Sequence, residues 1–130
     1  MNKVYEVKSQ ILGFEGISKI EIDVIDEFFA TLKDATTGEE LFTLVNPFAL
    51  KEYDFEMPTA MKVLLDANND SNLSVYNVVV LQNPINKSKV NFLAPIILNE
   101  DNSTVGQLVL SSTDYPHLSF AEDIEKFVAA

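Results

Sequence analysis

Apolar and polar residues alternate with a period of two along most of the chain, which is the pattern of strands with one buried face. It is clearest in KIEIDVID, where Ile20, Ile22 and Val24 point one way and mostly acidic residues point the other. The pattern predicts strands at 4–11, 19–26, 27–34, 41–47, 53–57 and 72–82, and two long strands within 90–112 joined by an Asn/Asp-rich turn. Strands that follow one another at such short spacing favour a mainly β fold, an antiparallel barrel or sandwich.

Two short helices interrupt this pattern. Pro58 suits a first helical position, and a stripe of apolar residues at helical spacing follows it, so we expect a helix over 58–67. The residues of this stripe are Met57, Met61, Leu64 and Leu65. Ser119 and Glu122 have the spacing of a capping box, which predicts a second helix over 119–128.

The run VNFLAPIILN, residues 90–99, is apolar at both odd and even positions, as expected of a strand covered on both faces. It is too short to span a membrane as a helix, which takes roughly 20 apolar residues. Pro95 cannot donate to a sheet, so it marks an edge, a bulge or a strand that switches sheets. The residues predicted to be buried are Phe92, Leu93, Ile96 and Leu98.

Composition narrows the possible partners. The chain has 130 residues, 47% of them hydrophobic, no cysteine and a formal net charge of −11. Its nine basic residues are all lysine. A nucleic-acid binder needs a basic face with arginine to grip phosphates and bases, so direct nucleic-acid binding is not expected. A basic protein partner fits this charge, and the lack of cysteine fits a reducing cytoplasm.

Candidate chemistry is sparse. His117 is the sole histidine, and the preceding Tyr115-Pro116 indicates a turn. No catalytic or phosphate-binding motif accompanies it. One stretch matches the first half of a calcium loop through Asp66, Asn68 and Asp70. Ser71 and Asn77 stand where such a loop needs Gly and Glu, so we expect a polar turn that ends the helix. No enzymatic activity, metal or cofactor is predicted.

The strings EIDVIDE (21–27) and AEDIE (121–125) are typical of solvated faces, whereas EYDFE (52–56) alternates acids with aromatics. That alternation makes residues 52–56 a candidate surface for a basic, partly apolar partner. Tyr53 and Phe55 would be its anchors, with acids as a steering rim; the residues are Glu52, Tyr53, Asp54, Phe55 and Glu56. The alternative is a structural one, with the aromatics inside the barrel and the acids outside.

Several of these stretches together resemble the bacterial flagellar assembly factor family, FliW. The matching pieces fall in the family's order over nearly the whole chain: ILGFEG (11–16), FTLVNPF (42–48), YDFEMP (53–58), VNFLAPIILN (90–99) and GQLVLSSTDYP (106–116). The resemblance implies a single barrel-like domain over 1–130, cytoplasmic, monomeric when free and without enzymatic activity. It gives six motif residues a structural role in the barrel: Asn46, Pro47, Asn91, Ala94, Pro95 and Asn99.

The resemblance also implies two partners. Members of the family bind flagellin and, when flagellin is scarce, bind the RNA-binding translational repressor CsrA and relieve its repression of flagellin mRNA. An acidic protein without arginine is a natural ligand for a basic regulator of this type. Two alternatives stay open from the residues: a dedicated flagellin chaperone without a regulatory target, and a small β-barrel enzyme or ligand carrier that uses carboxylates in a cavity.

Overall fold

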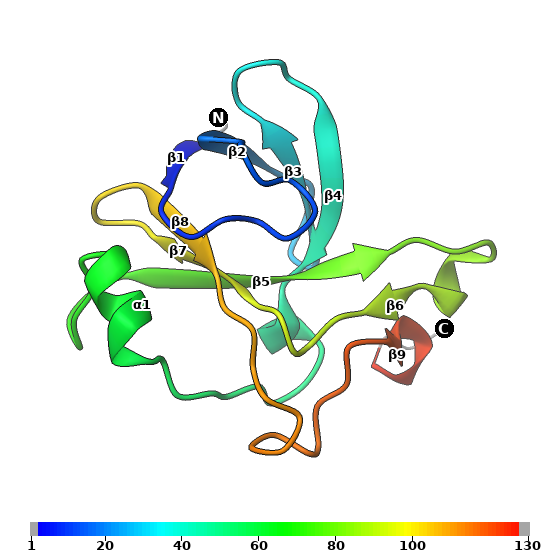
Figure 1. The fold of residues 1–130 in the computed structure, drawn as a ribbon. Helices are drawn as coiled ribbons and strands as arrows, with labels where there is room; N and C mark the ends of the chain where they lie inside the picture. The colour runs from blue at the N-terminus through cyan, green and yellow to red at the C-terminus, as the bar shows by residue number, and fades with distance from the viewer. Residues whose placement is uncertain (1–2, 128–130) are drawn as a thin grey trace.

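The computed structural model describes residues 3–127, and β structure dominates it (Figure 1). The strands are β1 (Lys3–Val7), β2 (Lys19–Val24), β3 (Phe29–Asp34), β4 (Glu40–Val45), β5 (Leu73–Val80), β6 (Lys89–Val90), β7 (Ile96–Asn99), β8 (Thr104–Gln107) and β9 (Glu122–Asp123). The helical elements within these residues are α1 (Thr59–Leu64) and the 3-10 turns η1 (Pro47–Ala49), η2 (Ile85–Lys87) and η3 (Ile124–Lys126).

Seven strands close into a barrel in the order β4-β3-β2-β1-β8-β7-β5, because β5 pairs back onto β4. The mainly β, barrel-like fold predicted from the sequence is therefore confirmed. One pair departs from the antiparallel pattern: β1 runs parallel to β8, with Glu6 opposite Thr104. Closure gives each of the seven strands a neighbour on both sides over at least part of its length, although the start of β5 extends past the last residue of β4 that pairs with it.

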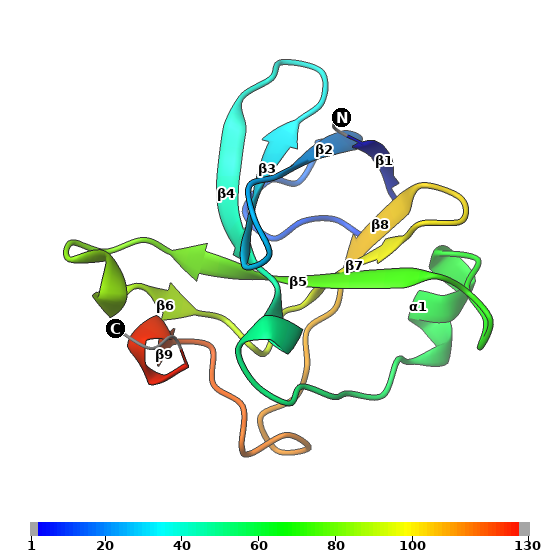
Figure 2. The ribbon, with the colours of Figure 1, turned by 180° about the vertical axis from the view of Figure 1, so that it is seen from behind.

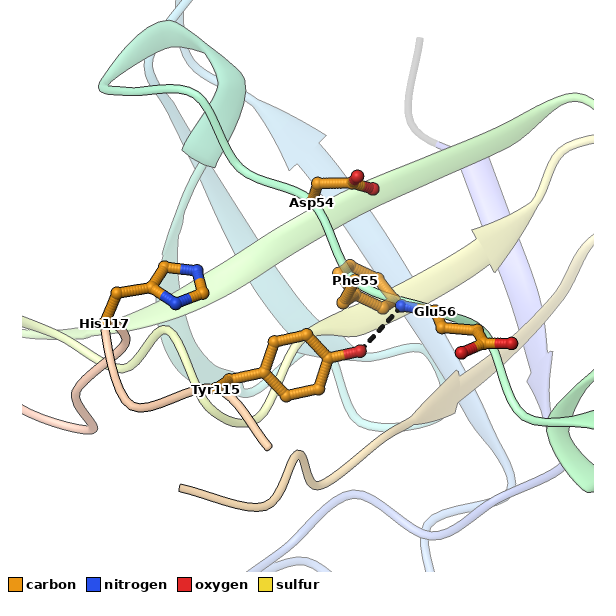
Figure 3. A pocket seen from close by; sticks show the side chains of 5 residues that line it. All are labelled: Asp54, Phe55, Glu56, Tyr115 and His117. Atoms are coloured by element: carbon orange, nitrogen blue, oxygen red, sulfur yellow. Dashed lines mark hydrogen bonds between the residues drawn. The ribbon is translucent and has the colours of Figure 1, made fainter. Parts of the chain in front are cut away.

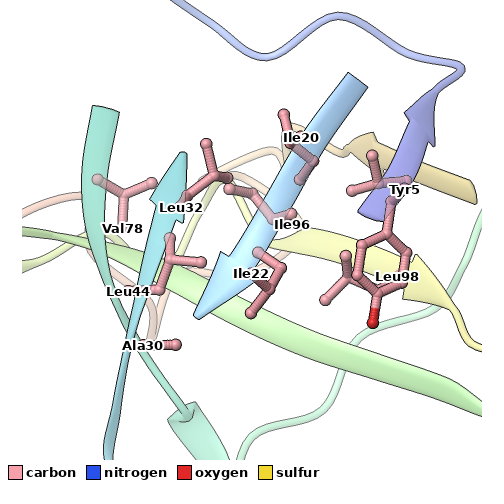
Figure 4. Packing of buried hydrophobic residues seen from close by; sticks show 10 residues of the cluster. Tyr5, Ile20, Ile22, Ala30, Leu32, Leu44, Val78, Ile96 and Leu98 are labelled. Carbon is pink, nitrogen blue, oxygen red and sulfur yellow. The ribbon is translucent and has the colours of Figure 1, made fainter. Parts of the chain in front are cut away.

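The barrel interior is filled by aliphatic side chains from alternate strand positions (Figure 4). The buried set is Tyr5, Ile20, Ile22, Ala30, Leu32, Leu44, Val78, Ile96, Leu98 and Val105. Ile20 and Ile22 lie inside as the alternation of 19–26 predicts, but Val24 is 62% exposed. The predicted inward direction of Val24 is therefore wrong, because the strand ends there and the chain turns away.

A second layer of irregular structure lies below β5 in the orientation of Figure 1, and the reverse view in Figure 2 shows the same arrangement. We call residues 46–58, 85–95 and 108–127 the irregular layer. Its regular elements are the 3-10 turns η1, η2 and η3 and the two-residue strands β6 and β9. The layer has its own core, in which the buried rings of Tyr53 and Phe92 pack with further, partly buried aromatic side chains. The buried residues of this core are Val45, Tyr53, Val79, Val90, Phe92, Leu110, Leu118 and Ile124.

The two strands predicted within 90–112 are present as β7 and β8, but each has only four residues, and Val90 belongs to the separate short strand β6. Residues 91–95 form turns instead of a strand, because the Asn91 side chain accepts a hydrogen bond from the Leu93 N–H at 3.0 Å. Pro95 immediately precedes β7 and its carbonyl still accepts from the Leu108 N–H. Phe92, Ile96 and Leu98 are buried as expected, whereas Leu93 is only half-buried.

The predicted helix over 119–128 is wrong for the described part of that range, and residue 128 lies outside the described residues. Glu122 and Asp123 form β9, which pairs with β6, and η3 follows. Lys89 forms an ion pair with Asp123 across these two strands. Strand pairing and this ion pair prevail over a capping box, since the Ser119 hydroxyl instead accepts from the Ala121 N–H.

Helix α1 falls within the predicted range 58–67 and packs on the outside of the barrel. Met61 and Leu65 are buried and Met57 is half-buried, but Leu64 is 47% exposed, so its predicted inward direction is wrong. The helix sits close to β8 because Gly106 has no side chain: a Cβ there would lie 3.1 Å from the Met61 sulfur. The polar turn predicted to end this helix is present, with the Asn68 side chain accepting from the Asp70 N–H.

Candidate protein-interaction surface

Residues 52–58, which we call the acidic segment, connect η1 to α1. Residues 53–57 are extended but belong to no sheet, so the predicted strand is wrong. Exposure nevertheless alternates along them: Tyr53 is buried, Phe55 and Met57 are half-buried, and Asp54 and Glu56 are exposed. The alternation that suggests a strand is thus satisfied by packing against the barrel instead of by pairing.

Tyr53 fixes the acidic segment to the molecule. Its hydroxyl donates to the Phe92 carbonyl at 2.6 Å and accepts from the Asn77 side-chain amide at 3.3 Å. Its ring lies 5.6 Å from that of Phe92. Burial raises the pKa of Tyr53 to about 12, against a smaller opposing effect of the Asn77 hydrogen bond. Tyr53 is therefore a core residue, and of the two aromatics Phe55 is the one that offers surface.

Tyr115 holds the same segment from a distant part of the sequence. Its hydroxyl accepts a hydrogen bond from the Glu56 N–H at 2.8 Å (Figure 3). His117 lies beside it, with the two ring centroids 6.3 Å apart. An open cleft of about 520 Å³ lies among Asp54, Phe55, Glu56, Tyr115 and His117.

Two further depressions border the segment. One, of about 210 Å³, we call the β5 groove; it is mainly apolar and its walls include Phe48, Phe55, Met57, Leu73 and Val75. The other, of about 360 Å³, is lined by Glu56, Pro58, Tyr115 and residues 108–111 and 114. Both share residues with the cleft at Tyr115, so the three hollows adjoin one another along the acidic segment.

The rim of these hollows is acidic. Glu52, Asp54, Glu56 and Asp114 are all exposed, and none forms an ion pair within residues 3–127. The nearest lysine in sequence, Lys51, is turned to the Phe92 and Phe127 rings, 5.0 and 5.5 Å from its Nζ. An apolar floor with a rim of uncompensated carboxylates suits a partner that is basic and partly apolar.

The family-motif residues named in the sequence analysis lie in turns and in the core, where their side chains or backbone groups form hydrogen bonds within the chain. The Asn46 side chain accepts from the Phe48 N–H, and Pro47 begins η1. Asn91 organises the turn before β7 as described, and the buried Ala94 offers its carbonyl to the Gln107 side chain. Asn99 is buried between β7 and α1, where its amide donates to the Leu65 carbonyl at 2.8 Å.

No group of three or more His, Cys, Asp or Glu side chains able to hold a metal occurs within residues 3–127. His117 has an aromatic neighbour and lies at the edge of the cleft. Among the described residues, no helix has the length and apolarity to cross a membrane.

Sequence reasoning missed Tyr115, Phe48 and Val109 as parts of this surface. Tyr115 and Glu56 are 59 positions apart, and no local pattern links them. Phe48 and Val109 are 56% and 62% exposed, respectively, but single exposed apolar residues are common on any protein. Asn77 did carry a signal, because it is a polar residue inside the apolar run of β5.

A family model and individual related proteins all indicate the same family for this chain. The family model described as FliW protein matches residues 1–119. Two proteins of Wolinella succinogenes are similar: Flagellar assembly factor FliW 2, 53% identical and covering 95% of this chain and 90% of its own, and Flagellar assembly factor FliW 1, 47% identical and covering 96% and 98%. Flagellar assembly factor FliW of Sulfurimonas denitrificans is 42% identical over 85% of this chain and 89% of its own.

A solved crystal structure of the flagellar assembly factor FliW has the same fold. Its TM-score is 0.83, with 94% of this chain and 85% of that chain covered. The two sequences are 18% identical, so this likeness concerns the fold alone.

Proposed function

Because this chain belongs to the FliW family of flagellar assembly factors, we propose that it works without enzymatic activity as a cytoplasmic partner switch. It binds flagellin and, in alternation, a CsrA-type translational regulator, and binding of the regulator relieves repression of flagellin mRNA. The observation that supports a binding role is the acidic segment, which combines exposed carboxylates with adjoining hollows, one of them mainly apolar.

In this proposal, the negative charge of the chain attracts the basic partner. The chain has a net charge of −11 and no arginine, and the carboxylates around the acidic segment have no ion-pair partners within the described residues. A basic RNA-binding protein would be drawn to this surface, and the same field would repel RNA from a neighbouring site. Association should therefore slow as salt rises, because charges beyond about 8 Å are screened at about 0.15 M ionic strength.

Dissociation should depend less on salt. The apolar hollows beside Phe55 would pack against the partner, and such a packed centre holds a complex more than its rim charges do. Measuring association and dissociation rates separately across a salt series tests this division.

The test reverses charge at the surface, with Asp54→Lys and Glu56→Lys together. A matched control places the same change at Glu39→Lys and Asp70→Lys, two exposed acids whose carboxylates form no hydrogen bond or ion pair in the part of the chain that is described. Asp114 is unsuitable as a control because it lines one of the hollows. Binding is measured against purified flagellin and a purified CsrA-type regulator.

We expect the surface variant to bind the regulator with a reduced on-rate and the control to keep it. Equal losses in both variants would mean that only net charge matters, and the assignment to residues 52–56 would be withdrawn. Unchanged binding in both at low salt would remove the electrostatic mechanism. Capture of flagellin alone would favour a dedicated chaperone.

A further inference from the structure

Resting on the proposed function, we propose that the β5 groove takes its partner as an added β-strand. The occupant is an extended segment of the partner protein in which lysine or arginine alternates with apolar residues. It pairs its backbone with the open edge of β5 at Leu73–Val75, beside the acidic segment.

The open edge exists because β4 is shorter than β5. The two strands pair from Thr43↔Val79 to Val45↔Asn77, and continuing this register would place Pro47 opposite Val75. Proline has no N–H to donate, and Asn46 and Pro47 instead begin the 3-10 turn η1. Figures 1 and 2 show the half of β5 near α1 continuing beyond the lower end of β4.

The register of β5 with β7 identifies which backbone groups face that edge. The Glu100 N–H donates to the Asn72 carbonyl at 2.8 Å, so hydrogen-bonded pairs alternate from there, to Ser74↔Leu98 and Tyr76↔Ile96. Leu73 and Val75 therefore point their N–H and C=O groups to the opposite edge, the side of β4. Neither residue has a hydrogen-bond partner on that edge among residues 3–127.

The opposite wall of the groove is also short of hydrogen bonds. The Glu56 N–H points to Tyr115, and adjacent residues of an extended chain point their N–H groups to opposite sides. Those of Phe55 and Met57 are thus directed away from Tyr115, and neither has a partner within the described residues. Unpaired backbone along an extended apolar groove is what strand addition uses for affinity.

Charge and shape select the occupant. Glu52, Asp54 and Glu56 are exposed at every second position, and side chains at every second position of an added strand share one face. Basic residues on that face would meet the carboxylates, and opposite charges on neighbouring strands attract. The intervening apolar residues would contact the apolar walls formed by Phe48 and Val75.

The probes are two synthetic nonapeptides of alternating lysine and valine with the same side chains. One has a free backbone and the other carries N-methyl groups on alternate amides, which blocks pairing but keeps charge and apolar content. A third peptide replaces lysine with glutamate. Affinity for the full chain is measured by fluorescence anisotropy, and protection is measured by amide hydrogen exchange at Leu73 and Val75, with Ile22 in the barrel as reference.

The free-backbone peptide should bind and slow exchange at Leu73 and Val75 but not at Ile22. The N-methylated peptide should bind about tenfold more weakly or worse, the loss expected for one or two hydrogen bonds, and the glutamate peptide should not bind. Equal affinity of the first two peptides, or protection elsewhere in the chain, would overturn strand addition.

The two proposals fail separately. If the Asp54→Lys/Glu56→Lys change slows the regulator while no peptide protects β5, the partner surface stands and the strand mode falls. If the peptide protects β5 but neither flagellin nor the regulator binds the chain, the docking groove stands and the assigned partners fall.

Discussion

The barrel and the irregular layer both bury apolar side chains, but they treat their backbones differently. In the barrel each strand pairs on both sides over at least part of its length, and the interior is mostly aliphatic. In the layer the elements are two or three residues long, and large rings such as Phe92 and Tyr53 form the core. Aromatic rings bury much area per residue, so the layer holds together with little sheet pairing. Backbone that packing alone holds in place stays available to a partner.

Removing one ring should break the layer. Phe92 is fully buried and contacts the Tyr53 and Phe127 rings, so Phe92→Ala should lower the free energy of unfolding by about 3–5 kcal/mol. Urea denaturation measures this. Phe120→Ala is the control, because Phe120 lies in the same layer but is 71% exposed and should change stability by less than about 0.5 kcal/mol. Similar costs for the two substitutions would place Phe92 outside the core.

The Tyr53 hydroxyl joins the acidic segment to the layer's core. Tyr53→Phe should cost about 1–3 kcal/mol, because the Phe92 carbonyl and the Asn77 amide each lose a buried partner. Tyr76→Phe removes a hydroxyl that has no hydrogen bond in the described structure and should cost less. If thermal or urea unfolding shows equal losses, the hydroxyl of Tyr53 does not fix the segment.

On the barrel side, Glu100 links the β7–β8 turn to β1. Burial raises the pKa of its carboxyl, but hydrogen bonds from Lys3, Tyr5 and Ser74 outweigh it and leave the pKa below the ordinary 4.5. The charged form therefore stabilises the fold above pH 4.5, and this contribution is lost as pH falls through the lowered value. Glu100→Gln should cost about 1 kcal/mol at neutral pH.

The difference between wild type and Glu100→Gln should shrink as pH falls below 4.5, which urea unfolding at several pH values would show. Glu39→Gln, at an exposed turn position, is the matched control and should give a difference near zero throughout. A Glu100→Gln difference that stays constant down to pH 3 would contradict the charged role of Glu100.

The smallest effect is expected at Tyr115. Tyr115→Phe removes the acceptor of the Glu56 N–H, so hydrogen exchange at Glu56 should become about tenfold faster, while global stability falls by no more than about 1 kcal/mol. Exchange at Ile22 in the barrel should not change. Unaltered exchange at Glu56 would show that packing, not Tyr115, holds the acidic segment.

Local pattern was sufficient for the barrel strands. In 19–26 and 27–34 the apolar residues recur at every second position, and hairpin neighbours pair as soon as the chain turns back, so periodicity and pairing agree. The burial of Phe92, Ile96 and Leu98 was also predictable, since residues 92–98 are apolar at both odd and even positions and leave no polar face for solvent. Short stretches of sequence of this kind were sufficient to predict a barrel-like fold and to identify the family resemblance.

Pairing between distant segments is what only the folded chain decides. Residues 53–57 alternate like a strand, yet they pair with no strand, and the hydroxyl groups of Tyr53 and Tyr115 hold them instead. Ser119 and Glu122 have the spacing of a helix-capping box, yet β6 lies beside residues 122–123 and pairs with them as a strand. The dipeptide Asn46-Pro47 predicts the end of β4. It does not show that Val75, on β5, is left without a pairing partner on that side. The periodicity of a segment shows which of its side chains face apolar and which face polar surroundings. A hydrogen-bonded ladder needs two segments, and whether these lie side by side depends on how all the residues between them fold.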